Sequence, residues 1–337
     1  MARPVIDQHA RRPWARLIAA AAAGCLAAAC GDEPALPTAP TIQTFVVQCP
    51  ADVLGQSADG GPVTIRVSAP TTTGGVLPST VSCAPPGPAY PVGSTRVSCQ
   101  ATDARGVRAT CSYAVNVAPP PLSATRFLAF GDSFTAGEVT TPVGTALGAD
   151  GFPNFRLIVV PNESYPTKLT ALLKARYFTQ AQQITVTNSG VPGEYTYLGI
   201  KRLPGVLAAT APQVVLFLEG ANDLEAIPTL KGVDDALRTL QSMVRMAQAS
   251  GAKVMIATLP PAKPGFRLSL PANIVQAFND ALRSGAPLEG AVVVDLQSTM
   301  TDVGTLIGND GLHPTEAGYT RIAESFFAAI RASYEGR

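Results

Sequence analysis

Five short runs of apolar residues constrain the fold of this 337-residue chain more than any other feature. They occupy residues 126–130, 184–187, 214–218, 253–257 and 291–295. A strand that is apolar at nearly every position is typical of a parallel sheet covered on both faces. Stretches of helical character separate the runs. Residues 124–337 are therefore predicted to form an α/β fold, a three-layer α/β/α sandwich around a five-stranded parallel sheet.

Two of the stretches between and after the runs have the period of an amphipathic helix. Apolar residues recur on one face between Val233 and Ala247, and again between Tyr319 and Ile330 near the C-terminus. In such folds a site forms at the carboxyl ends of the strands. Catalytic or binding residues are therefore expected in the segments that follow the runs.

Four polar motifs follow strands or precede the last helix. Ser133 ends the tripeptide Gly-Asp-Ser after the first run, Gly193 lies in the loop after the second, and Asn222 follows the third. Asp310 and His313 flank a glycine turn before the final amphipathic stretch. Taken alone, each motif also has an ordinary reading as a turn or helix cap, which is the stronger reading for Ser133 and Gly193, about equal for Asn222, and the weaker one for His313.

The residue types in these motifs fit nucleophilic catalysis. A serine needs a general base before it attacks a carbonyl, and His313 is the only histidine outside the N-terminal leader. Asp310 lies three residues earlier and can orient the imidazole. A glycine N–H at position 193 and the amide of Asn222 can both donate hydrogen bonds to an oxyanion. The chain is predicted to be a serine hydrolase.

In this order, the four motifs resemble the four blocks of the SGNH/GDSL hydrolase family, and the resemblance covers about 124–333. It implies a flavodoxin-like α/β/α fold and carboxylic ester hydrolysis through an acyl-enzyme, without cofactor or metal. It also implies the roles of five residues: Ser133 as nucleophile and oxyanion donor, Gly193 and Asn222 as further oxyanion donors, and Asp310 with His313 as the remaining triad members.

The chain departs from the family pattern at two positions. Phe134 replaces the leucine of the family name, and Glu194 follows the oxyanion glycine where aspartate is common. Two long segments without periodicity, 138–161 and 259–271, are expected to flank the pocket as lids or binding loops. Apolar residues in the first could hold an acyl chain or pack against the body of the domain.

The cysteines set residues 43–118 apart. Four of the six, Cys49, Cys83, Cys99 and Cys111, lie in this stretch, and none follows it. An even number in a small exported domain predicts two disulfides. Three pairings are open, of which we favour Cys49–Cys111 with Cys83–Cys99. Alternating residues at 63–68 and 113–117 predict the short strands of a β-sandwich.

This stretch resembles the HYR (hyalin repeat) module, a small all-β immunoglobulin-like domain. The resemblance rests on Cys49-Pro50, on the segment from Tyr90 to Asp103, and on residues 109–115. The module implies adhesion or spacing rather than chemistry. It could serve as a plain spacer or bind a glycan or protein ligand.

The N-terminus is typical of an export signal. Four arginines precede an apolar run at 17–29, which is too short to span a bilayer. The sequence Leu26-Ala-Ala-Ala-Cys30 resembles a lipoprotein cleavage box, so we expect a signal peptide at 1–29 and a lipid on Cys30. Cys25 is the competing site, and plain secretion is the alternative. The expected location is the bacterial cell envelope, with an anchor in a membrane.

Proline-rich segments at 30–42 and 119–123 are predicted to be a tether and an interdomain linker. The net charge is +1 and no basic stretch is interleaved with aromatics, so nucleic-acid binding is not expected. The leading hypothesis is hydrolysis of a lipid ester or small acyl ester. The alternatives are a carbohydrate acetylesterase guided by the HYR-like module, and a non-catalytic adhesion protein.

Overall fold

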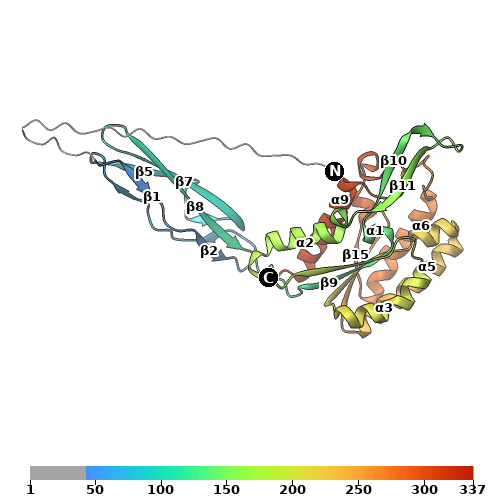
Figure 1. Ribbon diagram of the computed structural model, residues 1–337. Coiled ribbons are helices and arrows are strands. Elements are labelled where there is room, and N and C mark those ends of the chain that lie inside the picture. The colour runs from blue at the N-terminus through green and yellow to red at the C-terminus, as the bar shows by residue number, and fades with distance from the viewer. Residues whose placement is uncertain (1–42, 337) are drawn as a thin grey trace, which may run out of the picture. The chain divides into compact units, whose positions relative to one another are not determined.

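The computed structural model describes residues 43–336, so the predicted signal peptide, Cys25, Cys30 and the tether lie outside the described residues (Figure 1). No helix within this range is long and apolar enough to cross a membrane. Two stretches of different architecture follow each other along the chain, an all-β region and an α/β region.

The first region, residues 43–118, contains eight strands. Four of them form one sheet in the order β2-β8-β7-β5, and two smaller ladders pair β1 with β4 and β3 with β6. Their bounds are β1 Val46–Gln48, β2 Val53–Gln56, β3 Val63–Thr64, β4 Thr71–Thr73, β5 Thr80–Ala84, β6 Ala89–Tyr90, β7 Gly93–Thr102 and β8 Arg108–Ala118. The alternation seen at 63–68 becomes a strand only at its first two residues, although burial continues to alternate to Ser68.

Both disulfides have the favoured pairing, Cys49–Cys111 and Cys83–Cys99. The strand register brings three of the four cysteines together. Cys83 lies opposite Cys99 across β5 and β7, and Cys99 lies opposite Cys111 across β7 and β8. Directly opposed residues on antiparallel strands bring their side chains within contact distance. Cys83–Cys99 therefore cross-links β5 to β7, and Cys49, in the segment after β1, is linked to Cys111 on the neighbouring strand β8.

The second region contains the predicted five-stranded parallel sheet, in the order β12-β9-β13-β14-β15. The strands are β9 Arg126–Gly131, β12 Thr185–Gly190, β13 Val214–Leu218, β14 Lys253–Ala257 and β15 Val292–Val294. All four ladders between them are parallel. Every residue of β13 is buried, as expected for the central strand of a covered sheet.

Helices cover both faces of this sheet (Figure 1). Helices α2 and α9 pack together on one face, and α3, α5 and α6 lie on the other. Their bounds are α2 Tyr165–Arg176, α3 Thr196–Thr210, α5 Leu230–Ala249, α6 Ala272–Gly285 and α9 Glu316–Tyr334. Shorter helical segments are α1 Ser133–Ala136, α4 Ala221–Ala226, α7 Leu296–Thr299, α8 Val303–Leu306, η1 Pro161–Glu163, η2 Phe178–Gln180 and η3 Ala286–Glu289. The three-layer prediction is confirmed.

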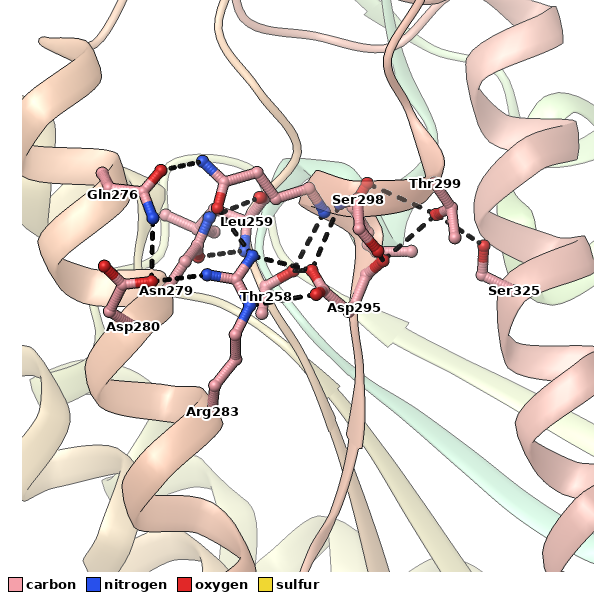
Figure 2. A network of polar contacts seen from close by, with 12 residues as sticks. Thr258, Leu259, Gln276, Asn279, Asp280, Arg283, Asp295, Ser298, Thr299 and Ser325 are labelled. Carbon is pink, nitrogen blue, oxygen red and sulfur yellow. Dashed lines mark hydrogen bonds and ion pairs between the residues drawn. The ribbon is translucent and has the colours of Figure 1, made fainter.

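A polar network ties α6 to the sheet at the carboxyl ends of β14 and β15 (Figure 2). The Arg283 guanidinium donates from Nε and Nη2 to the two carboxylate oxygens of Asp295, each at 2.9 Å. The Thr258 hydroxyl donates to Asp295 at 3.1 Å. Asn279 both donates to and accepts from the backbone of Leu259. These hydrogen bonds satisfy partly buried polar groups. They hold α6 against the carboxyl ends of β14 and β15, at the edge of the sheet on which the site forms.

One of the two expected loops is not a loop. Residues 138–161 contain an antiparallel hairpin of β10 Glu138–Leu147 and β11 Pro153–Val159. The sequence concealed it because most apolar residues toward its tip remain exposed, including Val143 at 49% and Leu147 at 62%. A strand is recognised by alternation only where one face is buried. The second segment, 259–271, has no helix or strand, as predicted.

Candidate active site

Ser133 lies where β9 turns into α1. The Asp132 carboxylate caps this short helix by accepting the Phe134 N–H at 3.0 Å. Strand β9 ends at Gly131, where a Cβ would lie 1.9 Å from the carbonyl oxygen of Leu218. Only glycine allows β9 and β13 to approach so closely at this point. The serine is thereby held at the carboxyl edge of the sheet.

Asp310 and His313 lie in the loop that precedes α9. One Asp310 oxygen accepts the backbone N–H groups of Leu312 and His313, at 2.9 and 3.0 Å. The other lies 2.6 Å from Nδ1 of His313. Gly311 has φ +92°, in the left-handed region, which lets the turn close around the carboxylate.

The structure brings the three residues into one hydrogen-bonded chain. Nε2 of His313 lies 2.9 Å from Oγ of Ser133, although the residues are 180 positions apart. Asp310 is fully buried, and Ser133 and His313 are each 4% exposed. A serine, an imidazole and a carboxylate joined in this order can abstract and return a proton during acyl transfer.

Electrostatics favour the charged form of this pair. Burial alone would raise the pKa of the Asp310 carboxyl, but hydrogen bonds from His313 and from backbone N–H groups outweigh it and keep that pKa below its usual value. Burial would lower the pKa of His313. Its contacts with Asp310 and Glu138 are stronger and raise the pKa to about 9.

The expected oxyanion donors come from the ends of β12 and β13. Gly193 is exposed and has φ +74°, so a side chain there would strain the backbone. The Asn222 amide donates one hydrogen to the carbonyl of Glu194 at 2.9 Å, and its second hydrogen remains for a ligand. A Cβ on Gly190 would lie 2.1 Å from the Ala136 nitrogen, so the end of β12 packs directly against α1.

Glu194, one of the two departures from the family pattern, supports this loop. Its carboxylate accepts from Nε and Nη2 of Arg202 on α3, at 2.9 and 2.5 Å. The same guanidinium donates to the hydroxyl and carbonyl of Ser189 and lies 3.9 Å from the Phe130 ring centre. The longer glutamate side chain reaches Arg202, which also donates hydrogen bonds to Ser189 on β12. Phe134, the other departure, is buried and packs edge-on to the His313 ring.

Sequence reasoning missed three acidic residues near the triad. Glu138 begins β10, and its carboxylate lies 3.3 Å from Nε2 of His313. Burial raises the pKa of Asp132 to about 7 and that of Glu219 well above its usual value. Neither oxygen of Glu219 has a hydrogen-bond partner among the described residues. Glutamate and aspartate after strands are common in turns, so the sequence carried no signal for this cluster.

Among residues 43–336, one group of side chains has the composition and spacing of a metal site: Cys49, Cys99 and Cys111. All three sulfurs are engaged in disulfides, so they are not thiolate ligands.

The model of the GDSL-like Lipase/Acylhydrolase family matches residues 129–321. The chain belongs to this family. The matched range includes every residue of the expected site, from Ser133 to His313. The HYR domain model matches residues 43–117, in agreement with the second resemblance. This GDSL-family protein is a carboxylic ester hydrolase preceded by a HYR domain.

Two characterised relatives are esterases. The chain is 29% identical to esterase TesA of Pseudomonas aeruginosa over 170 residues, which cover 48% of this chain and 77% of that protein. It is 24% identical to an acetylxylan esterase of Xylanibacter ruminicola over 187 residues, covering 50% of this chain and 38% of the relative. A lipase/acylhydrolase structure from Enterococcus faecalis aligns with TM-score 0.49 and 21% identity, covering 63% of this chain and 98% of that one.

Proposed function

We propose that this enzyme hydrolyses acyl esters outside the cytoplasm through an acyl-enzyme on Ser133. The observation that carries the proposal is the continuous chain from Oγ of Ser133 to Nε2 of His313 and from Nδ1 to Asp310. His313 takes the serine proton as Oγ attacks the ester carbonyl, and returns it to the leaving alcohol. Water then repeats the sequence and releases the acid.

The oxyanion that forms when Oγ of Ser133 attacks the ester carbonyl needs hydrogen-bond donors. The backbone N–H groups of Ser133 and Gly193 and the free amide hydrogen of Asn222 are the groups we assign to it. They lie on α1, on the loop after β12 and on α4. Helix α1 packs against the end of β12, and Asn222 is hydrogen-bonded to Glu194 in the loop that follows it. Donors that are already held in place need no rearrangement as charge develops, which is why they lower the barrier.

A lipid ester, a lysophospholipid or a small acyl ester fits the surroundings of the site. The hairpin that begins beside His313 carries exposed apolar side chains at Val143, Leu147 and Val159. The oxyanion loop adds Val191, and Leu198 follows on α3, both also exposed. Exposed apolar side chains on the elements that carry the site favour an acyl chain over a highly polar acid.

A chain-length series of p-nitrophenyl esters tests this proposal. We expect kcat/KM to rise from acetate toward medium chains, because each buried methylene contributes about 0.8 kcal/mol. An organophosphonate should label Ser133 and block turnover. Equal rates on all chain lengths would remove the acyl-site assignment, and labelling of another serine would remove the mechanism.

The membrane anchor is proposed from the sequence of the N-terminal leader alone. If Cys30 is lipidated, the protein should enter the detergent phase and incorporate labelled fatty acid, and Cys30→Ser should abolish both. Labelling that survives in Cys30→Ser but is lost in Cys25→Ser would move the anchor to Cys25. Labelling in neither wild type nor variants would favour plain secretion.

A second candidate function, deacetylation of a carbohydrate, is favoured by one hollow near the oxyanion residues. It has a volume of about 370 Å³ and is lined by Tyr195, Tyr197, Asp223 and Thr239 among others. Tyr197 is 53% exposed and stacks on Tyr195 with ring centres 5.5 Å apart. Aromatic faces beside carboxylate and hydroxyl groups suit a sugar ring, and one relative is an acetylxylan esterase.

The two candidates separate in one comparison. If a sugar occupies the hollow, Tyr197→Ala should lower kcat/KM on acetylated xylooligosaccharides and leave p-nitrophenyl acetate unchanged. Tyr197→Phe, which keeps the aromatic face stacked on Tyr195, is the matched control and should retain activity on both substrates. Equal loss on both substrates would show that Tyr197 only supports the oxyanion loop.

A further inference from the structure

The first strand of the hairpin lies against the catalytic pair. Glu138 Oε2 is 3.3 Å from Nε2 of His313, the same nitrogen that lies 2.9 Å from Oγ of Ser133. The Glu138 side chain is 14% exposed. Within residues 43–336, the ion pairs of both Glu138 and Asp310 are made with His313 alone. Two carboxylates therefore face one imidazole, Asp310 at Nδ1 and Glu138 at Nε2.

Glu138 is held at this place from two sides. The Tyr319 hydroxyl on α9 donates to the Glu138 carbonyl at 2.6 Å. In the hairpin, Glu138 pairs with Val159. Thr140, two residues along and so on the same face of β10, packs against Gly308 in the loop that carries the catalytic aspartate and histidine. The hairpin thus braces the loop as well as presenting the carboxylate.

The contact has a clear chemical meaning. With Nδ1–H directed to Asp310, a neutral His313 presents a lone pair at Nε2, which accepts the serine proton. A carboxylate oxygen beside that lone pair gains nothing from it. Once Nε2 carries a proton, the same oxygen can accept a charge-assisted hydrogen bond. Glu138 therefore favours the imidazolium over the neutral ring.

We propose that Glu138 is a positioning residue that stabilises the imidazolium formed when Ser133 attacks the ester. The proposal rests on the proposed role of His313 as general base. Glu138 strengthens that base. It also keeps the ring protonated in the free enzyme to a higher pH, so activity begins at a higher pH than with Asp310 alone.

The groups that face His313 set the sign of this pH effect. They are Asp310 on its own loop, Glu138 on β10 and Asp132 at the start of α1. The Tyr319 hydroxyl on α9 donates to the Glu138 carbonyl beside them. The two carboxylates in contact with the ring outweigh burial and raise the pKa of His313 to about 9. Removing one of them must lower that pKa.

The test is the pH dependence of kcat/KM on a neutral ester, p-nitrophenyl acetate. Wild type should rise through a midpoint in the alkaline range, and Glu138→Gln should shift that midpoint down by about one pH unit or more. Its plateau rate should fall severalfold because the base is weaker. Glu138→Asp keeps the charge and should lie between the two. Glu324→Gln, which removes an exposed carboxylate from α9, should change nothing.

A direct readout is the titration of the His313 ring by NMR of histidine-labelled protein. The chain has two histidines, and His313→Asn assigns the signals. An unchanged ring pKa and an unchanged rate midpoint in Glu138→Gln would overturn the proposal. If His313→Ala retains full turnover, the proposed mechanism itself fails, whatever Glu138 does. If His313→Ala is inactive and only the Glu138 variants match wild type, the role of Glu138 alone is wrong.

Discussion

The all-β region and the α/β region of this chain are stabilised in different ways. Residues 43–118 bury only two small apolar clusters, centred on Val97 and Val115 and on Phe45 and Val47, and two disulfides join their strands. The α/β region has no cysteine, and one continuous core runs through its sheet and helices. A small domain buries too little apolar surface to be stable by packing alone, and cross-links compensate.

The difference extends to polar groups. The α/β region leaves oxygens of Asp132 and Glu219 buried without hydrogen-bond partners, beside the triad. Each such group costs about 1–3 kcal/mol. A large core can carry that cost, and the cost is concentrated where chemistry is expected. In this chain the candidate catalytic residues lie in the α/β region and the disulfides lie in the all-β region. The following predictions test whether these two roles are separate.

The largest expected effect is on turnover. Ser133→Ala and His313→Ala should each lower kcat by a factor on the order of 10⁴ or more, and the double variant should be no worse, because the residues act as a unit. Thermal unfolding should change little. Steady-state rates on a p-nitrophenyl ester provide the measurement. Full activity in Ser133→Ala would place the chemistry elsewhere and reopen the adhesion hypothesis.

The disulfides should matter for stability and not for rate. Replacing Cys49 and Cys111 with alanine should destabilise the all-β region by about 4 kcal/mol, since the bond closes a loop of 62 residues. Replacing Cys83 and Cys99, 16 residues apart, should cost about 3 kcal/mol. Denaturant unfolding measures both. A fall in kcat on a soluble ester in either variant would contradict the separation of roles.

Removing an oxyanion donor should have an intermediate effect. Asn222→Ala should lower kcat about a hundredfold with little change in KM, because the amide acts on charge that develops only in the transition state. The same amide also holds the Glu194 carbonyl. Arg202→Lys, which loosens Glu194 without touching Asn222, is the control. If the two variants lose the same rate, loop position rather than oxyanion donation accounts for the loss.

A smaller effect is expected in the stability of the α/β region. The Glu335 carboxylate contacts Arg176, Tyr177 and Arg331, which link α2 and α9. Burial would raise its pKa, but these donors outweigh it and lower the pKa to about 2. The stabilisation is present above the unfolded pKa near 4.5 and is lost as pH falls toward 2. Glu335→Gln should cost roughly 2 kcal/mol at pH 7, less than the full pKa shift implies because solvent screens these partly exposed pairs, and much less near pH 2, as measured by calorimetry.

The smallest effect is expected from removing the all-β region. A chain that starts near Leu122 should hydrolyse short soluble esters about as well as the longer protein, even under reducing conditions. This follows because the α/β region has its own core and no disulfide. Loss of most activity would show that residues 43–118 contribute to the active site, and the comparison between the two regions would fail.

Periodicity and motif order predicted much of this molecule. The five predicted strands form one parallel sheet, and β9, β13 and β14 are apolar at nearly every position because they are covered on both faces. The edge strand β12 is largely polar and has no buried residue. His313 was predicted as the base because it is the only histidine outside the leader, and Ser133 and Asp310 were predicted from the position and order of their motifs. The hairpin at 138–159 was missed, since its exposed apolar side chains show no buried face.

The sequence by itself determined which residues could do chemistry and which strands had to be buried, because both follow from residue type and local period. Only the tertiary structure decided the strand order, the approach of His313 to Ser133 across 180 residues, and the placement of Glu138 against the same imidazole. Those contacts join distant segments, and they depend on how helices and strands pack around a shared core. No local pattern encodes a distance of 3.3 Å between a hairpin and a loop.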